Sequence, residues 1–204
     1  MENFEQIERE FLDTEDDNNL IEFHRKYFEI FNNIEFVDED ATLKKIWILS
    51  ELSGVYYRVG DNEKCNELTK LSFNLFDRFS EKFNYDLQED NQYKIFLMEI
   101  AGRHFENKRF FKAKRYYQKI KGWEKYKNQI DNSIEISEYH AMKRFNKFFG
   151  LFGIILIVIN YLIKYFNGNK NLAFIFAIAG GIVIVVFGLL QTYYYKKPTV
   201  NIGS

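Results

Sequence analysis

Proline and cysteine are almost absent from this 204-residue sequence. The only proline is Pro198, so the strongest helix breaker is missing from nearly the whole chain. The only cysteine is Cys65, which excludes a disulfide bond within the chain. Sustained alternation of apolar and polar residues is also missing, whereas apolar residues recur at helical spacing. We therefore predict an all-α protein.

Motifs typical of enzymes are missing as well. The three histidines, His24, His104 and His140, are scattered, and none has a metal-binding neighbour at a useful helical spacing. The sequence contains no HExxH or GxSxG motif and no glycine-rich phosphate-binding loop. We expect a protein that is not an enzyme, with no metal and no cofactor, and we interpret His24 and His104 as packed helix residues.

Two long apolar runs, Phe148–Phe166 and Leu172–Leu190, dominate the C-terminal part of the chain. Each has 19 residues, or about 28 Å as a helix, which is close to the thickness of a bilayer's hydrocarbon core, about 30 Å. Lys164 is the only charged residue in either run, and neither run has the polar stripe of a soluble helix. The sequence predicts a transmembrane hairpin rather than the buried hairpin of a soluble core.

Small residues recur within these runs at spacings that let helix backbones approach closely in lipid. The simplest partner for the second run is the first run, and self-association into an oligomer is the alternative. Asn160 can hydrogen-bond across either interface. The residues predicted to pack the membrane helices are Gly150, Gly153, Asn160, Ala173, Ala177, Gly181 and Gly188.

Basic residues that flank the runs predict the orientation of the hairpin. Lysine and arginine are enriched on the cytoplasmic side of membrane proteins, and here they are more numerous outside the hairpin than near its connection, which has only Lys164 and Lys170. The N-terminus lacks the features of a secretory signal peptide. We expect a multi-pass protein of the cell inner membrane with both termini in the cytoplasm. The predicted interface anchors are Lys143, Arg144, Lys147, Tyr193, Tyr194, Tyr195, Lys196 and Lys197.

Charge is distributed unevenly along the chain. Residues 1–100 hold 11 Lys/Arg and 24 Asp/Glu, a balance of −13, whereas residues 101–142 hold 10 and 5, a balance of +5. The basic residues of this middle segment form a candidate site for a partner or an anion. They suit a solvated face that complements the acidic half, contact with an anionic leaflet, or binding of nucleic acid or a nucleotide. The candidate residues are Arg103, Lys108, Lys112, Arg115 and Lys119.

The periodic pattern divides the chain into helices and three parts. The predicted helices cover about 3–12, 18–33, 41–59, 62–83, a segment that ends near 106, 108–123, and a segment from about 127 that can continue into the first apolar run. We expect a soluble helical domain at 1–140, a juxtamembrane segment with two transmembrane helices at 141–195, and a short tail at 196–204.

Two predicted helix pairs resemble tetratricopeptide (TPR) repeats. The stretch WILSELSGVYYRVGDNEKCNELTKLSFNLF places small and aromatic residues at the packing positions of that motif, and FLMEIAGRHFENKRFFKAKRYYQKI fits less closely. The packing positions are Leu49, Leu52, Ser53, Tyr56, Cys65 and Ser72 in the first stretch, and Leu97, Ile100, Ala101, Ala113, Tyr117 and Ile120 in the second. The resemblance implies helical hairpins with a concave surface that grips a protein segment.

Two functions from different classes follow from these patterns. The first is a membrane-anchored TPR-like adaptor that recruits a protein partner to the inner face of the membrane. The second is an oligomeric membrane effector that forms a pore or perturbs the bilayer once its soluble domain senses a ligand. Several bacterial antiviral systems have this layout, and the abundance of Lys, Asn, Ile, Phe and Tyr suggests an AT-rich bacterial genome.

Overall fold

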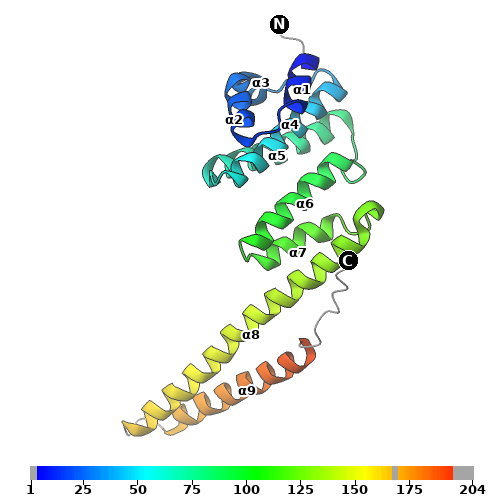
Figure 1. The fold of residues 1–204 in the computed structure, drawn as a ribbon. Coiled ribbons are helices and arrows are strands. Elements are labelled where there is room, and N and C mark those ends of the chain that lie inside the picture. Colours follow the sequence, from blue (N-terminus) through cyan, green and yellow to red (C-terminus); the bar gives the residue numbers. More distant parts are fainter. Residues whose placement is uncertain (1–3, 167–169, 195–204) are drawn as a thin grey trace. The chain divides into compact units, whose positions relative to one another are not determined.

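The computed structural model describes residues 4–166 and 170–194, and every regular element in those ranges is a helix (Figure 1). The predicted all-α fold is therefore confirmed for these residues. The elements are α1 (Phe4–Leu12), α2 (Asp17–Lys26), α3 (Phe28–Asn32), α4 (Glu39–Arg58), α5 (Asn62–Phe83), α6 (Asn91–Glu106), α7 (Phe110–Lys119), the 3-10 helix η1 (Glu124–Tyr126), α8 (Lys127–Tyr165) and α9 (Lys170–Tyr194).

The chain divides into two compact units, Met1–Glu99 and Ile100–Ser204, and the boundary falls within α6. The two units carry opposite charge. The first holds 11 Lys/Arg and 24 Asp/Glu, a balance of −13, and the second holds 17 and 5, a balance of +12. The predicted boundary near residue 140 lies inside α8, which continues through it without a break.

An aromatic cluster joins α1 and α2 to α4 in the first unit. Phe11 packs against Phe23 and Trp47, with ring centroids 5.5 and 5.6 Å apart. Phe23 also contacts Tyr27 and Phe31, at 4.9 and 5.9 Å. Phe11 and Phe23 are both buried.

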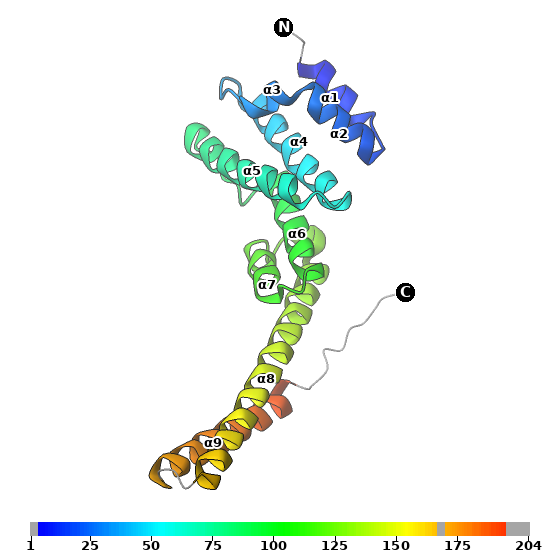
Figure 2. The ribbon, with the colours of Figure 1, turned by 90° about the vertical axis from the view of Figure 1, so that its left-hand side faces the viewer.

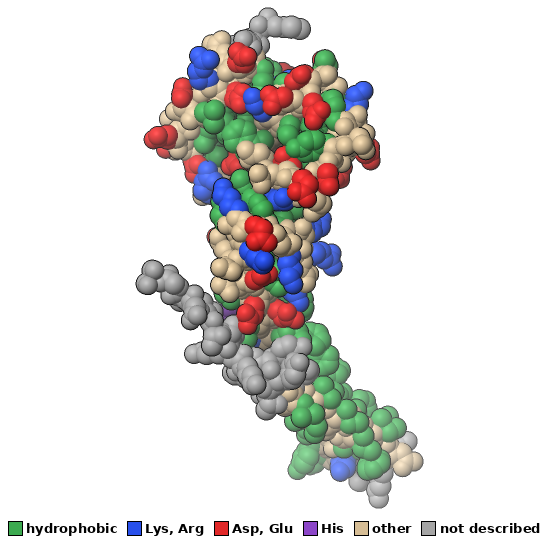
Figure 3. Space-filling view, turned by 90° about the vertical axis from the view of Figure 1, so that its right-hand side faces the viewer, with side chains coloured by type: hydrophobic (Ala, Val, Ile, Leu, Met, Phe, Trp, Pro, Cys, Tyr) green, Lys and Arg blue, Asp and Glu red, His purple; other side chains and the backbone are tan. Residues whose placement is uncertain are grey.

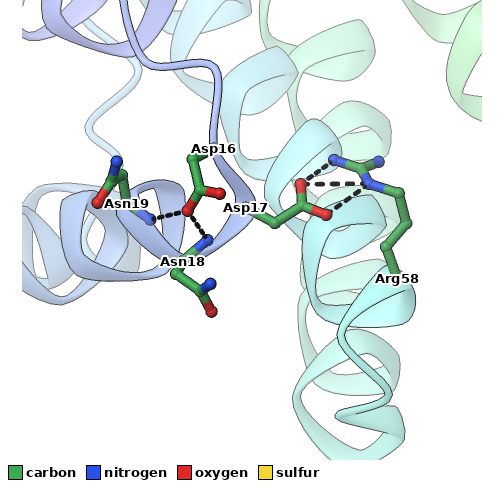
Figure 4. Close-up of polar contacts among 5 residues, drawn as sticks. All are labelled: Asp16, Asp17, Asn18, Asn19 and Arg58. Carbon is green, nitrogen blue, oxygen red and sulfur yellow. Dashed lines mark hydrogen bonds and ion pairs between the residues drawn. The ribbon is translucent and has the colours of Figure 1, made fainter.

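The acidic turn before α2 caps that helix (Figure 4). The Asp16 carboxylate accepts hydrogen bonds from the backbone N–H groups of Asn18 and Asn19, at 2.8 and 3.2 Å. Asp17 pairs with the guanidinium of Arg58 at the end of α4, where the shortest contact, from Nη2, is 2.7 Å. These carboxylates therefore start one helix and hold it against another.

The single helix predicted over residues 18–33 is two helices in the structure. At Tyr27 the backbone leaves helical geometry, with φ −107° and ψ 18°. The Tyr27 hydroxyl donates a hydrogen bond to Glu10 of α1 at 2.6 Å, and Lys26 pairs with the same carboxylate at 2.8 Å. The hydrogen bonds from Lys26 and Tyr27 lower the pKa of Glu10 below its usual value. The break therefore coincides with a contact to α1 that apolar spacing does not reveal.

Helices α4 and α5 form a packed hairpin (Figure 1). Gly60 has a φ of +85° in the connection, a conformation that residues with a Cβ rarely adopt. Asp61 then caps α5 by accepting a hydrogen bond from the backbone N–H of Lys64 at 3.0 Å. All six residues predicted to pack this pair are buried: Leu49, Leu52, Ser53, Tyr56, Cys65 and Ser72.

The first part of α6 packs on α5 through aromatic rings. Phe96 contacts Phe73 and Phe76, with centroids 5.0 and 5.7 Å apart, and Tyr93 contacts Phe76 at 5.0 Å. The helix starts at a capping carboxylate, because Asp90 accepts a hydrogen bond from the Tyr93 backbone N–H at 2.6 Å. This part of α6 completes the core of the first unit.

In the second unit, α7 packs along the N-terminal part of α8 (Figures 1 and 2). Ala113 of α7 is fully buried, and so is Ile130 of α8. Lys114 bridges the two helices through an ion pair with Glu138 at 3.0 Å. Helix α7 is shorter than the predicted 108–123. Lys108 before it has a φ of +57°, and Ile120 after it, with φ −109° and ψ 13°, has left helical geometry.

Helix α8 continues from its contact with α7 into the first apolar run, as the sequence predicts. Its 39 residues correspond to about 58 Å at 1.5 Å per residue. It packs side by side with α9 (Figures 1 and 2). Both helices are long and apolar enough to cross a membrane. Hydrophobic side chains cover the visible face of this hairpin (Figure 3), and Phe148 and Phe174 are 67% and 64% exposed.

Candidate functional site

Glycines at the contact between α8 and α9 let the two helices approach closely. A Cβ added at Gly153 would lie 2.9 Å from Ile184 Cγ1 and 3.2 Å from Val183 Cγ1. A Cβ at Gly180 would lie 3.0 Å from an Ile157 side-chain atom and 3.3 Å from the Gly153 carbonyl oxygen. The hairpin therefore depends on small residues from both helices, as expected for association in lipid.

The small residues predicted in α9 do not all face α8. Ala173 is buried, and Gly180 rather than Gly181 continues its row. Two helical turns of contact need a spacing of seven residues, whereas steps of four rotate steadily away from the partner. Ala177 is half-buried, and a Cβ at Gly181 or Gly188 would meet no atom of the described residues within 4 Å. The prediction that Gly181 packs against the first span is wrong.

Gly150 and Asn160 occupy the α8 side of the same hairpin. A Cβ at Gly150 would lie 3.1 Å from the Phe187 ring, so Gly150 packs as predicted. The Asn160 Oδ1 atom is buried and has no hydrogen-bond partner among the described residues. The hydrogen bond predicted for Asn160 is therefore not made by that oxygen within the described part of the chain.

The turn between α6 and α7 is held against α8 by one arginine. Lys108 adopts a left-handed conformation, and its backbone N–H and that of Arg109 donate hydrogen bonds to the carbonyls of Phe105 and His104, at 2.9 and 2.8 Å. The Lys108 carbonyl then accepts a hydrogen bond from Arg144 Nη1 of α8 at 3.0 Å. Two basic segments that are 36 residues apart in the sequence are thereby brought together.

A groove with basic and aromatic walls lies at this junction, with a volume of about 380 Å³. We call it the basic groove. Its cationic residues come from the turn, from the start of α7 and from α8, and its apolar residues include Phe111, which is 60% exposed. The lining residues are Lys108, Arg109, Phe110, Phe111, Lys112, Ala141, Arg144, Phe145 and Phe148.

A second groove lies next to the basic groove, along the α8–α9 hairpin. We call it the membrane groove, and its volume is about 670 Å³. Arg144 and Phe148 line both grooves, so the two are contiguous. The lining residues of the membrane groove are Arg144, Lys147, Phe148, Gly150, Leu151, Ile154, Ile184 and Phe187.

Only part of the predicted basic face lines the basic groove. Lys108 and Lys112 line the basic groove. Arg115 and Lys119 are exposed on α7 but do not line it, and Lys119 lies 5.7 Å from the Tyr116 ring centroid. Arg103 is half-buried in α6. Arg109, which the predicted set did not include, also lines the groove, and its adjacency to Lys108 was the available signal.

The predicted interface anchors fall into two groups. Arg144 and Lys147 line the membrane groove, and Lys143 is exposed beside them in α8. Tyr193 and Tyr194 close α9, but their side chains lie outside the described residues, as do Tyr195, Lys196 and Lys197 entirely. The cations of α8 and of α7 are far apart in the sequence, so only the tertiary fold shows that they lie together.

The histidines pack against aromatic rings. His24 is 2% exposed, and its Nδ1 lies 3.0 Å from the Tyr56 hydroxyl. Burial lowers the pKa of His24 to about 4. His104 stacks on Tyr116 at 5.4 Å, and burial together with Lys112, Arg109 and Arg103 lowers its pKa. Both histidines are packed residues, as predicted. Two of the cations that lower the pKa of His104, Lys112 and Arg109, line the basic groove.

The first unit has a hollow of its own, with a volume of about 740 Å³. We call it the α3–α5 hollow. Val37 at its edge is 81% exposed, and the Arg78 guanidinium lies 4.7 Å from the Phe36 ring centroid. The lining residues are Ile34, Glu35, Phe36, Val37, Arg78, Glu81 and Lys82. An exposed apolar residue among charges of both signs is suited to contact with a polypeptide.

Three or more His, Cys, Asp or Glu side chains do not gather anywhere in residues 4–166 and 170–194 in a way that could hold a metal ion. No protein-family model, no curated protein and no solved structure matches this chain.

Proposed function

We propose that this protein is a non-enzymatic adaptor, anchored in the membrane by the α8–α9 hairpin, whose TPR-like helical hairpins recruit a protein partner. One observation carries the proposal. Helix α8 runs unbroken from a soluble helix pair into a hairpin that packs on itself through Gly153 and Gly180 and leaves its outer surface apolar. Such a hairpin needs lipid to cover it but needs no further protein chain.

The proposed location is the inner membrane of a bacterial cell, with both termini in the cytoplasm. Exposed Lys143, Arg144 and Lys147 at the start of the first span support this orientation, because lysine and arginine are retained on the cytoplasmic side. In this arrangement the partner binds on the cytoplasmic side. The acidic first unit, with its balance of −13, would favour a partner segment with basic residues.

The α3–α5 hollow is the proposed contact for the partner. Its test is photo-crosslinking of the full-length chain in cells from the position of Val37, compared with Val59, which is exposed but lies outside the hollow. We expect a defined crosslinked product from position 37 only, and Phe36→Ala should abolish it. The product should persist when residues 148–190 are replaced by an unrelated two-span anchor. Loss of the product on that replacement would contradict the adaptor.

The second candidate function is an oligomeric membrane effector. Gly181 favours it, because a Cβ there meets nothing within 4 Å, so this side of α9 can approach another helix closely. Light scattering of the detergent-solubilised full-length chain gives the number of subunits. The effector predicts a ring of several subunits that Gly181→Leu or Ala177→Leu disrupts without loss of membrane insertion. A monomer or dimer that is unchanged by these substitutions would exclude it.

A further inference from the structure

We propose that the basic groove and the membrane groove together bind one anionic glycerophospholipid of the surrounding bilayer. Its phosphate would lie against Lys108, Arg109, Lys112 and Arg144. One acyl chain would follow the membrane groove between α8 and α9. The inference rests on the membrane insertion in the proposed function and adds a specific ligand to it.

The cationic end suits a phosphate ester. Four positively charged side chains line the basic groove, and none of the described residues that line it is acidic. Arg144 uses Nη1 for the Lys108 carbonyl at 3.0 Å, so the other edge of its guanidinium can face an anion. The low pKa of His104, caused by burial and then by Lys112, Arg109 and Arg103, agrees with a positive potential here.

The apolar end suits an acyl chain. Leu151, Ile154, Ile184 and Phe187 line the membrane groove, and Leu151 and Ile154 are exposed. Gly150 also lines this groove, and the Phe187 ring packs directly against it, because a Cβ there would lie 3.1 Å from that ring. An apolar channel bounded by two helices that need lipid cover is suited to a hydrocarbon chain.

The distance between the two ends matches one leaflet. Arg144 and Ile154 are ten residues apart on α8, or about 15 Å along the helix, which is half of the hydrocarbon core of about 30 Å. Phe148, one turn beyond Arg144, lines both grooves and lies where the head group of a lipid gives way to its chain. A free phosphate or nucleotide would use the basic groove but would leave the membrane groove uncovered. This continuity favours the lipid.

The test uses the full-length chain in mixed bilayers of phosphatidylglycerol and phosphatidylcholine, with bromine on the acyl chains of one lipid at a time. Trp47 and Trp123 are replaced by phenylalanine, and a single tryptophan is introduced by Phe148→Trp. Bromine quenches tryptophan fluorescence only on contact. We expect phosphatidylglycerol to quench Phe148→Trp about fivefold or more above its share of the bilayer. At Phe174→Trp, on the exposed side of α9, both lipids should quench in proportion to their amounts.

Two variants that remove the same amount of charge test which residues cause the preference for phosphatidylglycerol. Lys108→Gln with Arg109→Gln and Lys112→Gln should remove it. Lys121→Gln with Lys125→Gln and Lys127→Gln, which remove the same charge outside both grooves, should leave it in place. Leu151→Phe, which narrows the membrane groove without adding a second tryptophan, should weaken it while the cations remain.

The outcomes separate the lipid site from membrane insertion. If neither lipid quenches Phe174→Trp, the hairpin is outside the bilayer, and the lipid site and the proposed anchor fail together. If Phe174→Trp is quenched but Phe148→Trp shows no preference, the lipid site alone is wrong. If inorganic phosphate or ADP abolishes the preference, the groove takes a soluble phosphate and the lipid assignment is overturned.

Discussion

Arg144 Nη1 donates a hydrogen bond to the backbone carbonyl oxygen of Lys108 at 3.0 Å, which joins α8 to the α6–α7 turn. The carbonyl is available because Lys108 adopts a left-handed conformation with φ +57°. A cation of α8 thus holds a second cation beside it. Two like charges are kept close by a backbone contact, which leaves their remaining hydrogen-bond donors for an anion.

Lys108→Gly is expected to stabilise the second unit. Glycine adopts a positive φ without the steric cost that a Cβ imposes, so the free energy of unfolding should rise by about 0.5–1 kcal/mol. Thermal unfolding of the detergent-solubilised full-length chain measures the change. Asn84→Gly tests the same effect in the first unit, where Asn84 has φ +50°. A lower melting temperature for Lys108→Gly would show that its side chain contributes more than its backbone conformation costs.

Lys112→Gln is expected to raise the pKa of His104. Burial, and then repulsion from Lys112, Arg109 and Arg103, holds that pKa below the usual value for histidine. Loss of one cation weakens the repulsion, and burial alone should keep the pKa below its usual value. The titration of the histidine ring protons by NMR, in the full-length chain in micelles, measures the shift. Lys125→Gln is the control, and an equal shift in both variants would contradict this assignment.

Gly153→Leu is expected to separate α8 from α9. Even a Cβ at this position would lie 2.9 Å from Ile184 Cγ1, so a leucine would force the helices apart at a cost of about 1–3 kcal/mol. The melting temperature in detergent should fall. Gly181→Leu is the matched control, because nothing lies within 4 Å of its Cβ position. Equal destabilisation by both substitutions would contradict the observed pairing of the helices.

The first unit is expected to lose stability as the pH falls from 6.5 towards 4. Burial lowers the pKa of His24 from 6.5 to about 4, so below pH 6.5 the unfolded chain binds a proton that the folded chain excludes. The contribution of His24 is complete above pH 6.5 and is lost over this window, to a total of about 3 kcal/mol. Unfolding measurements across this pH range test it. His24→Gln should flatten the dependence, and an unchanged slope would exclude His24 as its origin.

Apolar periodicity predicted most of the fold because one face of each helix is buried. The range 62–83 for α5 and the continuation from Lys127 into the first span agree with the structure. The split between α2 and α3 was not predictable, since Tyr27 leaves helical geometry where its hydroxyl bonds to Glu10, 17 residues away. Local spacing reveals which residues share a face but not which distant side chain interrupts a helix.

The candidate site was predicted only in parts. Lys108 and Lys112 were assigned to one basic face and Arg144 to the membrane interface, and nothing in their spacing indicated that they line one groove. Gly180 was missed for a different reason. A repeat of four residues selected Gly181, whereas the contact between α8 and α9 follows a repeat of seven that joins Ala173, Gly180 and the neighbourhood of Phe187.

Helix α8 has no break between the part that contacts α7 and the part that contacts α9. In the proposed anchor, about 30 Å of its roughly 58 Å would cross the hydrocarbon core, and the part before that packs against α7. A tilt of this hairpin in a thinner or thicker bilayer would therefore also tilt α7 and its cations relative to the membrane plane. In the proposed membrane anchor, bilayer thickness would then set the angle at which the basic groove faces the lipid head groups.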